Sequence, residues 1–318
     1  SVLIPLLLEY GYNVLVYDIL YYGHKHLPLE HKNLKIVKGD IRDIAKLKEA
    51  MINIHTVIHL ACISNDVSFE LDEALSTSIN YDAFEPLVKI AKNAGVNRFI
   101  YASSSSVYGV SEKKNVTEDH PLIPLTLYNK FKGLCEPILF DYTDDNFIGV
   151  VFRPATVCGY APRQRLDLSV NILTNLAIRN NEITVFGGKQ LRPNLHIQDY
   201  AELCKTLISC DDNLISNEIF NCGYENKSII EIAQDVKNVV EERTNFEKSI
   251  SLKITDSDDK RSYHINSEKI KNRLGFIPKR SVVNAVNGLF NAFQDNLLPN
   301  SLEDDKYFNI RTMKKIKA

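Results

Sequence analysis

The sequence lacks several features that would point to common classes of protein. It has no excess of charge of either sign, with 38 Lys and Arg against 40 Asp and Glu, so nothing favours a nucleic-acid or membrane-surface partner. No apolar run is long enough to cross a bilayer, and the opening SVLIPLLLEY has no basic flank of a signal peptide. The composition, 44% hydrophobic and 25% charged, is that of a globular protein, which we expect to be cytoplasmic.

The cysteines lack the spacing of a metal site. The chain has six of them, and they form no CxxC pair and have no cluster of histidines nearby. Zinc sites use such pairs at short spacing, and structural disulfides belong to oxidising compartments. We therefore expect free thiols and no bound metal.

The first half of the chain alternates short apolar runs with segments of helical periodicity. Strands are expected at residues 13–18, 34–37, 55–60, 98–102 and 147–152, and helices at residues 43–51 and 86–93. Gly11 and Gly95 follow two of the helical segments, where a left-handed cap is usual. Continuous apolar strands separated by helices predict an α/β fold, with a doubly wound parallel sheet covered on both faces.

A Gly-rich turn, which dinucleotide-binding folds place between the first strand and the first helix, is missing. The chain begins at Ser1, inside what we expect to be that first helix. The first strand lies at the centre of such a sheet, so its loss would leave buried backbone groups unpaired. We therefore expect the sequence to be truncated, and the alternative is a degenerate protein without catalytic activity.

The second half is less regular. Helical patterns occupy residues 168–178, 199–209, 229–242 and 282–294, and short β-type stretches occupy residues 183–186 and 250–254. This pattern suits a smaller α/β lobe packed on the parallel sheet. The tail after Pro299 is polar, and we expect it to be loosely held.

Two acids follow expected strands. Asp18 ends the second strand of the fold, where a carboxylate can accept hydrogen bonds from the ribose hydroxyls of NAD and would repel the extra phosphate of NADP. Asp40 follows the next strand, where it can meet the adenine amino group. Either acid could instead cap a helix, and a cap and a cofactor contact are compatible.

Tyr128 and Lys132 are four residues apart, so on a helix they share a face. A lysine ammonium beside a phenol favours the phenolate, and we expect it to lower the pKa of Tyr128 so that this side chain can act as a base. The spacing alone occurs in many surface helices. It gains weight from Ser104, which lies in a serine run directly after the strand at residues 98–102, because ligands bind at the carboxyl ends of parallel strands.

At this point the sequence resembles the extended short-chain dehydrogenase/reductase family, the nucleotide-sugar epimerases and dehydratases. The resemblance covers nearly the whole chain and rests on several motifs in order. These are VIHLA from Val57, Asn80, YASSSSVYG from Tyr101, YNKFK from Tyr128, FRPATVCG from Phe152, Arg192 with HIQD from His196, and KRSYHINSEK from Lys260.

The resemblance implies a Rossmann-type NAD-binding domain, at residues 1–160 with 195–222 returning to it, and a nucleotide-sugar lobe at residues 161–194 and 223–318. It implies Ser104, Tyr128 and Lys132 as the catalytic residues. Expected cofactor contacts are Asp18, Asp40, Ile41, Leu60, Ala61, Tyr128, Lys132, Arg153 and Ala155. Expected contacts of a nucleotide-diphosphate sugar are Ser105, Ser106, Arg163, Arg165, Arg192 and Arg261. The alternative for Arg192 and Arg261 is surface salt bridging, and Arg163 and Arg165 could equally cap the helix that follows them. A homodimer through the helices around residues 71–93 and 125–142 is also implied.

The serine run bears on the reaction. Family members that remove water across sugar carbons five and six carry an Asp-Glu pair where this chain has Ser105 and Ser106. Without these carboxylates we do not expect the chain to catalyse 4,6-dehydration. The reaction that remains is oxidation of the sugar at C4. We expect an NAD-dependent nucleotide-sugar 4-epimerase, with a 4-dehydrogenase as the alternative. The stretch from Ala161 to Asn171 resembles a subgroup that acts on GDP-heptose or related bacterial surface sugars, some of whose members are 4-dehydrogenases.

Overall fold

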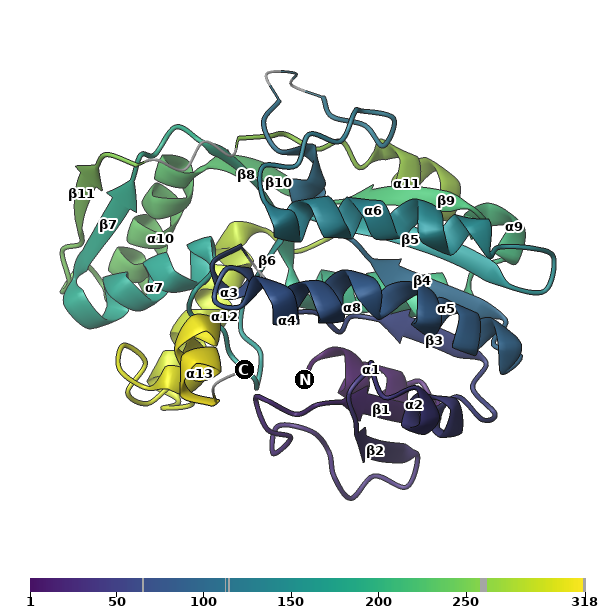
Figure 1. The fold of residues 1–318 in the computed structure, drawn as a ribbon. Helices are drawn as coiled ribbons and strands as arrows, with labels where there is room; N and C mark the ends of the chain where they lie inside the picture. The colour runs from purple at the N-terminus through teal and green to yellow at the C-terminus, as the bar shows by residue number, and fades with distance from the viewer. Residues whose placement is uncertain (65, 112, 114, 258–261, 317–318) are drawn as a thin grey trace.

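The computed structural model describes residues 1–64, 66–111, 113, 115–257 and 262–316. A parallel sheet of four strands forms its centre, with β3 (Thr56–His59), β4 (Arg98–Ala102), β5 (Ile148–Pro154) and β9 (Glu218–Cys222) in that order. A second parallel pair, β1 (Val14–Asp18) and β2 (Leu34–Lys38), lies below β3 in Figure 1. Within the described residues no ladder joins β1 to β3.

Helices cover both faces of the four-stranded sheet, because side chains of successive strand residues point to opposite sides. From β4, Phe99 and Tyr101 pack with α2 (Ile44–Ala50), α5 (Phe84–Asn93) and α6 (Leu127–Asp141). From the same strand, Ile100 and Ala102 pack with α8 (Ile197–Ser209) and α11 (Glu268–Leu274). The expected doubly wound α/β sheet is therefore confirmed.

Side-chain caps fix where several of these helices begin. Asp43 accepts a hydrogen bond from the backbone N–H of Lys46 at the start of α2, and Thr126 caps α6 in the same way. The remaining elements of this half are α1 (Leu3–Glu9), α3 (Asp66–Phe69), α4 (Glu73–Thr77), η1 (Ser78–Asp82), η2 (Ser105–Tyr108) and α9 (Asp212–Ile215). No helix among the described residues has the length and apolar character that a membrane span requires.

The smaller lobe packs α7 (Ser169–Asn180), α10 (Ile229–Arg243) and α12 (Val282–Gln294) around a common apolar cluster. Its parallel pair is β7 (Glu182–Phe186) with β11 (Ser251–Thr255), and a three-stranded sheet of β10 (Glu225–Ser228), β8 (Leu191–His196) and β6 (Thr156–Cys158) connects it to the rest.

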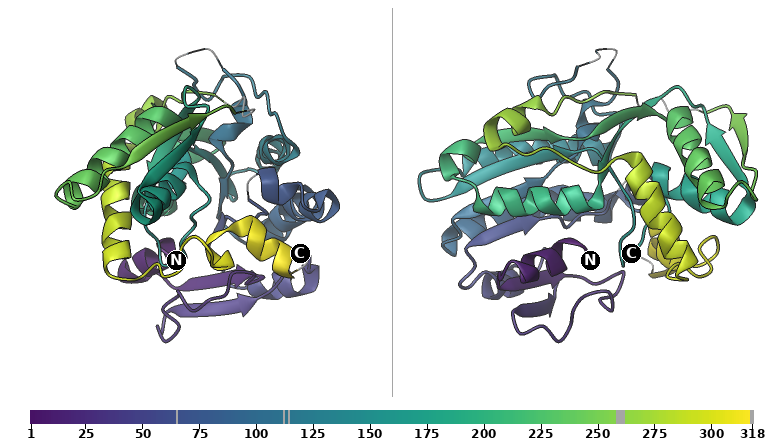
Figure 2. Two further views of the ribbon diagram at one scale, coloured as in Figure 1. Left: turned by 90° about the vertical axis from the view of Figure 1, so that its left-hand side faces the viewer. Right: turned by 180° about the vertical axis from the view of Figure 1, so that it is seen from behind.

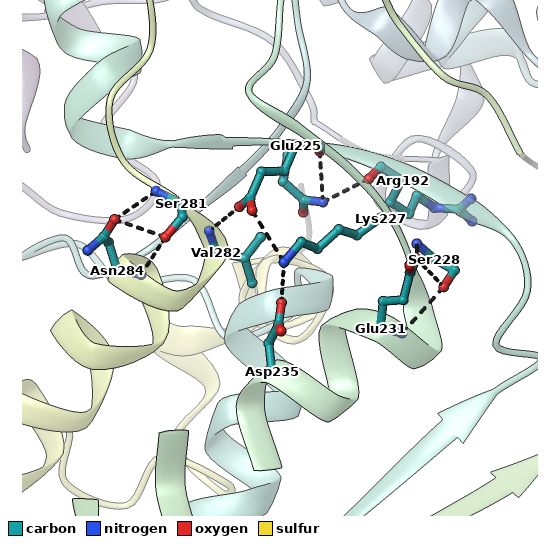
Figure 3. Close-up of polar contacts among 10 residues, drawn as sticks. Arg192, Glu225, Lys227, Ser228, Glu231, Asp235, Ser281, Val282 and Asn284 are labelled. Carbon is teal, nitrogen blue, oxygen red and sulfur yellow. Dashed lines mark hydrogen bonds and ion pairs between the residues drawn. The ribbon is translucent and has the colours of Figure 1, made fainter. Parts of the chain in front are cut away.

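An ion-pair network fixes this lobe internally (Figure 3). Lys227 Nζ lies 2.5 Å from Asp235 of α10 and 3.2 Å from Glu225 of β10. The other carboxylate oxygen of Glu225 accepts the backbone N–H of Val282 at 2.5 Å, at the start of α12. Lys227 therefore links β10 to α10, and Glu225 links the same strand to α12. Burial lowers the pKa of Lys227, but the two carboxylates outweigh this effect and raise it.

The C-terminal tail corrects an expectation. Residues 300–316 are packed rather than loosely held, and they include η3 (Asp305–Tyr307) and α13 (Asn309–Ile316). Tyr307 packs beside Leu166, and Met313 is only 2% exposed among Ile63 and Ile79. The segment crosses from the lobe back to α3 (Figure 2). Its apolar residues are widely spaced, so no continuous hydrophobic run predicts that this segment is packed.

Candidate active site

A cavity of about 700 Å³ opens between the carboxyl ends of β4 and β5 and the smaller lobe. Ser104, Tyr128 and Lys132 line it together with Ala155. A smaller cavity of about 160 Å³ lies beside it, lined by residues that follow β1 and β2. Leu60 and Cys62 belong to both walls, so the two cavities are neighbouring parts of one cleft.

Helix α6 supplies the two residues, Tyr128 and Lys132, that the sequence analysis expected to be catalytic. Tyr128, Lys132 and Glu136 are spaced by four residues, so they point to the same side of the helix. Lys132 is buried, and its Nζ donates a hydrogen bond to the carbonyl of Ala102 at 2.8 Å. The backbone carbonyl of Lys132 accepts from the Tyr101 hydroxyl at 3.2 Å, which ties the helix to β4.

The pKa of Tyr128 shows that one part of the expectation is wrong. Burial raises the pKa of this phenol well above its ordinary value, and Cys62 and Asp66 add to the effect while Arg165 opposes it. Lys132, which we expected to lower this pKa, instead directs its ammonium to the Ala102 carbonyl. The phenol is therefore in its neutral form around pH 7.

The serine run forms a compact turn at the end of β4. Ser104 caps the start of η2 and accepts the backbone N–H of Ser106 at 3.1 Å, and the hydroxyls of Ser104 and Ser106 lie 2.7 Å apart. Ser106 also donates to the side-chain oxygen of Asn129 on α6. Gly109 ends the turn with φ +66°, where a Cβ atom would lie 1.8 Å from the carbonyl of Ile123.

A buried ion pair lies beneath this turn. Arg153 Nε and Nη2 donate to the two carboxylate oxygens of Glu136 at 2.9 and 2.5 Å, and both side chains are at most 3% exposed. Ser103 donates to the same carboxylate at 2.6 Å, and Arg153 Nη1 reaches the Tyr108 hydroxyl at 2.7 Å. The guanidinium of Arg153, expected at the cofactor, thus faces Glu136 because a buried cation needs a partner there.

The smaller cavity contains both acids that the sequence analysis singled out. Asp18 accepts the backbone N–H of Leu20 at 2.6 Å. Asp40 forms a 2.6 Å ion pair with Arg42, whose hydrogen bond lowers the pKa of Asp40. Ile41 and Ala61 line this cavity too, and so does Met313 of α13, which the sequence analysis missed.

Four arginines were expected at a substrate. Arg163 stacks on the Tyr22 ring at 4.0 Å and donates to Asn309 at 2.6 Å, and burial lowers its pKa to about 10. Arg165 pairs with Asp167 at 2.9 Å. Both line the large cavity, as do Arg192, Ser105 and Ser106. Arg261 lies outside the described residues.

Two buried donors on the cavity wall lack a hydrogen-bond partner among the described residues. They are Nη2 of Arg165 and the hydroxyl of Ser169 at the start of α7. Buried polar atoms are normally paired, so an orphan on a cavity wall indicates a place for a polar ligand. No group of three or more His, Cys, Asp or Glu suited to a metal occurs in the described part of the chain.

The site also contains residues that sequence reasoning missed. Asn129 and Glu136 belong to α6, and the spacing of four from Lys132 to Glu136 could have indicated a common face. The partners that give these side chains their surroundings, Ser106 and Arg153, lie far away in sequence. Met313 carried no signal, since a lone methionine in a basic tail has no distinguishing pattern.

Fold and site together define an enzyme of the doubly wound, dinucleotide-binding type, with a Tyr/Lys helix at the carboxyl ends of its strands. A model of the NAD dependent epimerase/dehydratase family matches residues 1–223. The chain belongs to this family.

Known relatives of the chain differ in reaction. The dTDP-D-glucose 4,6-dehydratase of Bos taurus is 30% identical over 258 residues, which are 78% of this chain and 70% of that protein. The UDP-glucose 4-epimerase of Lactobacillus helveticus is 25% identical over 307 residues, 88% of this chain and 89% of that protein. The solved structure of the Thermotoga maritima UDP-glucose 4-epimerase with UDP-glucose has a similar fold, with a TM-score of 0.80, 23% identity and coverage of 93% and 95% of the two chains.

Proposed function

We propose that this protein is an NAD-dependent nucleotide-sugar 4-epimerase that works through a 4-keto intermediate. The observation that carries the proposal is the meeting of Ser104, Tyr128 and Lys132 in one cavity, with hydroxyls at Ser105 and Ser106. Dehydration across C5 and C6 needs an acid and a base beyond the Tyr/Lys pair, and serines at these positions do not readily serve as either. The 4,6-dehydratase relatives make this the point to test first.

The residues around the cleft fit NAD. Asp18 and Asp40 would hold the adenosine half, Ala61 and Ala155 would line the path, and Lys132 would reach the nicotinamide ribose. When bound, NAD supplies the acceptor for the hydride from C4 and returns it. No Gly-rich turn for the pyrophosphate occurs within residues 1–318.

Residues of this chain would bind the C4 hydroxyl and accept its proton. Ser104 would contact the C4 hydroxyl, and Tyr128 would take its proton as the C4 hydrogen leaves as hydride. Because burial raises the pKa of Tyr128, this phenol needs a positive charge nearby before it can act as a base. Arg165 already lowers the pKa of Tyr128 in part. Turning the Lys132 ammonium from Ala102 toward Tyr128 would add a second positive charge.

The orphan donors of Arg165 and Ser169 support a nucleoside diphosphate as the carrier of the sugar. A planar guanidinium and a hydroxyl at a helix N-terminus are donors that suit phosphate oxygens. Arg163 and Arg192 line the same cavity and would add positive charge. The nucleotide base and the sugar are not specified by these contacts.

The second candidate is a 4-dehydrogenase that uses the same residues and releases the keto sugar. The stretch from Ala161 to Asn171, with its two arginines, favours it by resemblance to surface-sugar enzymes. Incubation with UDP-, dTDP- and GDP-sugars separates the two. A C4 epimer without net NADH supports the epimerase, accumulating NADH with keto sugar supports the dehydrogenase, and a 4-keto-6-deoxy product would show dehydration and overturn both.

Replacing Tyr128 by Phe tests whether the site is catalytic at all. The variant removes only the phenol oxygen, and we expect kcat to fall at least about 100-fold with little change in nucleotide affinity. Unchanged turnover would mean that the proton leaves by another route. Tyr128 would then not be the base. The non-catalytic NAD-binding protein that the sequence analysis kept open would instead show no turnover even with Tyr128 present.

We also propose a homodimer through α5 and α6. Leu127 and Leu134 of α6 are 37% and 39% exposed, which is unusual for leucines on a helix that otherwise packs well. Sedimentation should give a dimer, and Leu134→Glu should give a monomer. A wild-type monomer at micromolar concentration would contradict this.

A further inference from the structure

Asn129 is fully buried beside the catalytic turn, and the proposed reaction has not used it. Its side-chain oxygen accepts a hydrogen bond from Ser106, while its Nδ2 has no partner among the described residues. The amide oxygen is therefore the atom through which Asn129 acts on the turn.

A hydroxyl carries one proton, which fixes the direction of the chain of hydrogen bonds. Ser106 gives its proton to Asn129, so it can only accept in its 2.7 Å contact with Ser104. Ser104 must then be the donor in that contact. Its oxygen also accepts the backbone N–H of Ser106 at 3.1 Å.

One lone pair of Ser104 remains, and Ser104 lines the large cavity. The group that it offers to a ligand is thus an acceptor, because its only proton points toward Ser106. An alcohol can donate to this lone pair, whereas a ketone has no proton and needs a donor.

We propose that Asn129, acting through Ser106, is a positioning residue that holds Ser104 as a hydrogen-bond acceptor and makes the site prefer the 4-hydroxyl sugar over its 4-keto form. This inference rests on the proposed function, since it concerns the two forms of the substrate in that reaction. The hydroxyl sugar is thereby bound through its own C4 proton, which must turn from Ser104 toward Tyr128 before Tyr128 takes it.

The test compares two ligands that differ only at C4, UDP-xylose and UDP-4-keto-xylose. Their affinities are measured by calorimetry on NAD-bound protein carrying Tyr128→Phe, so that neither is converted. The corresponding dTDP-6-deoxyglucose pair covers the other pyrimidine nucleotide. Because each pair shares its nucleotide, the ratio of affinities reports on C4 and is insensitive to a general loosening of the site.

We expect the hydroxyl sugar to bind about tenfold more tightly, the worth of one hydrogen bond. Ser106→Ala and Asn129→Ala each free the proton of Ser104 and should bring the ratio to within about twofold of unity. Ser106→Thr keeps the hydroxyl and should keep the ratio. Lys130→Ala, an exposed neighbour on α6, is the matched control.

Equal affinities for the two forms, or a preference for the ketone, would overturn the inference. So would a ratio that survives in both Ser106→Ala and Asn129→Ala. If Asn129→Ala does not fold, Ser106→Ala against Ser106→Thr decides alone. Binding of both sugars with no turnover by the Tyr128-containing protein would overturn the proposed function and leave the ratio valid, whereas no binding of either pair would overturn both.

Discussion

The two ends of the cleft are built in different ways. At the end that we propose to be catalytic, here the catalytic end, Tyr128 and Lys132 come from a 15-residue helix that packs on a fully buried strand, above the Glu136–Arg153 pair. At the end that we propose to hold adenine, here the adenine end, Asp18 ends β1, Asp40 lies on the loop after β2, and Met313 from the C-terminal helix completes the wall.

The two ends should differ in how they lose their structure. The catalytic end is part of the main core, so its geometry should be lost only when the whole domain unfolds. The adenine end is closed by an eight-residue helix and a small apolar cluster, and we expect this helix to detach without unfolding of the main core. Substitutions at the two ends should therefore separate global stability from cofactor retention.

The largest effect is expected at the buried ion pair. Glu136→Gln removes the charge that Arg153 faces and leaves a buried guanidinium without a counter-ion. Breaking one partner of such a pair costs about 3–5 kcal/mol of unfolding free energy, which urea titration will measure.

Two control variants accompany Glu136→Gln. Lys306→Ala breaks the exposed pair with Asp304 and should cost at most about 1 kcal/mol. Glu136→Leu combined with Arg153→Met removes both charges and should recover most of the loss. If Glu136→Gln lowered the unfolding free energy no more than Lys306→Ala does, the catalytic end would not be the rigid part of the cleft.

The next largest loss of stability is expected on truncation of Met313. Met313→Ala empties the cluster under α13 and should destabilise the docking of this helix by about 2 kcal/mol, the low end for such truncations because the site is small. Hydrogen exchange should then show faster opening of residues 309–316, with residues 98–102 unchanged. NAD should dissociate about tenfold faster.

Lys314→Ala, the exposed neighbour of Met313, should change neither property. Loss of protection across β4 in Met313→Ala would instead mean that the two ends unfold together. The comparison drawn between them would then be wrong.

The same contrast explains how much the sequence could predict. Strand β4 and helix α12 have the expected bounds, and Tyr128 and Lys132 share a helix face as expected, because continuous apolar runs and period-3.6 patterns are local. The contacts that the sequence analysis did not predict are made between residues far apart in the sequence. Arg153 is 17 residues from Glu136, and Met313 meets Ile63 across most of the chain, so neither contact leaves a local pattern. The pKa of Tyr128 was misjudged for the same reason, since burial is a property of the whole fold.

His59 lies on β3, between the two ends, and gives a pH-dependent effect. Burial, and then Lys132, lower its pKa from 6.5 to about 3, and its ring packs against Phe84 and Tyr101. In the unfolded chain His59 therefore binds a proton below about pH 6.5, whereas in the folded protein it binds one only below about pH 3. Stability should fall with acid across this window, by about 2 kcal/mol from His59 between pH 7 and pH 5.

His59→Phe should remove that part of the slope when unfolding free energies are measured at several pH values. His55→Phe, at the exposed start of the same segment, is the control. A slope unchanged in His59→Phe would assign the acid sensitivity to other groups.

The smallest effect is expected at Asp18, where the substitution can be made nearly isosteric. In Asp18→Asn the side-chain oxygen can still accept the N–H of Leu20, which has the left-handed φ of 60°, so the turn should persist. Only the charge is lost. We expect NAD to bind about tenfold more weakly, about 1.4 kcal/mol, and NADP to bind more tightly, because its phosphate no longer meets a carboxylate. Both affinities can be measured by fluorescence titration. Equal losses for NAD and NADP would mean that Asp18 shapes the loop rather than selecting the cofactor, and the adenine end would then owe its specificity to Asp40 and to the helix that carries Met313.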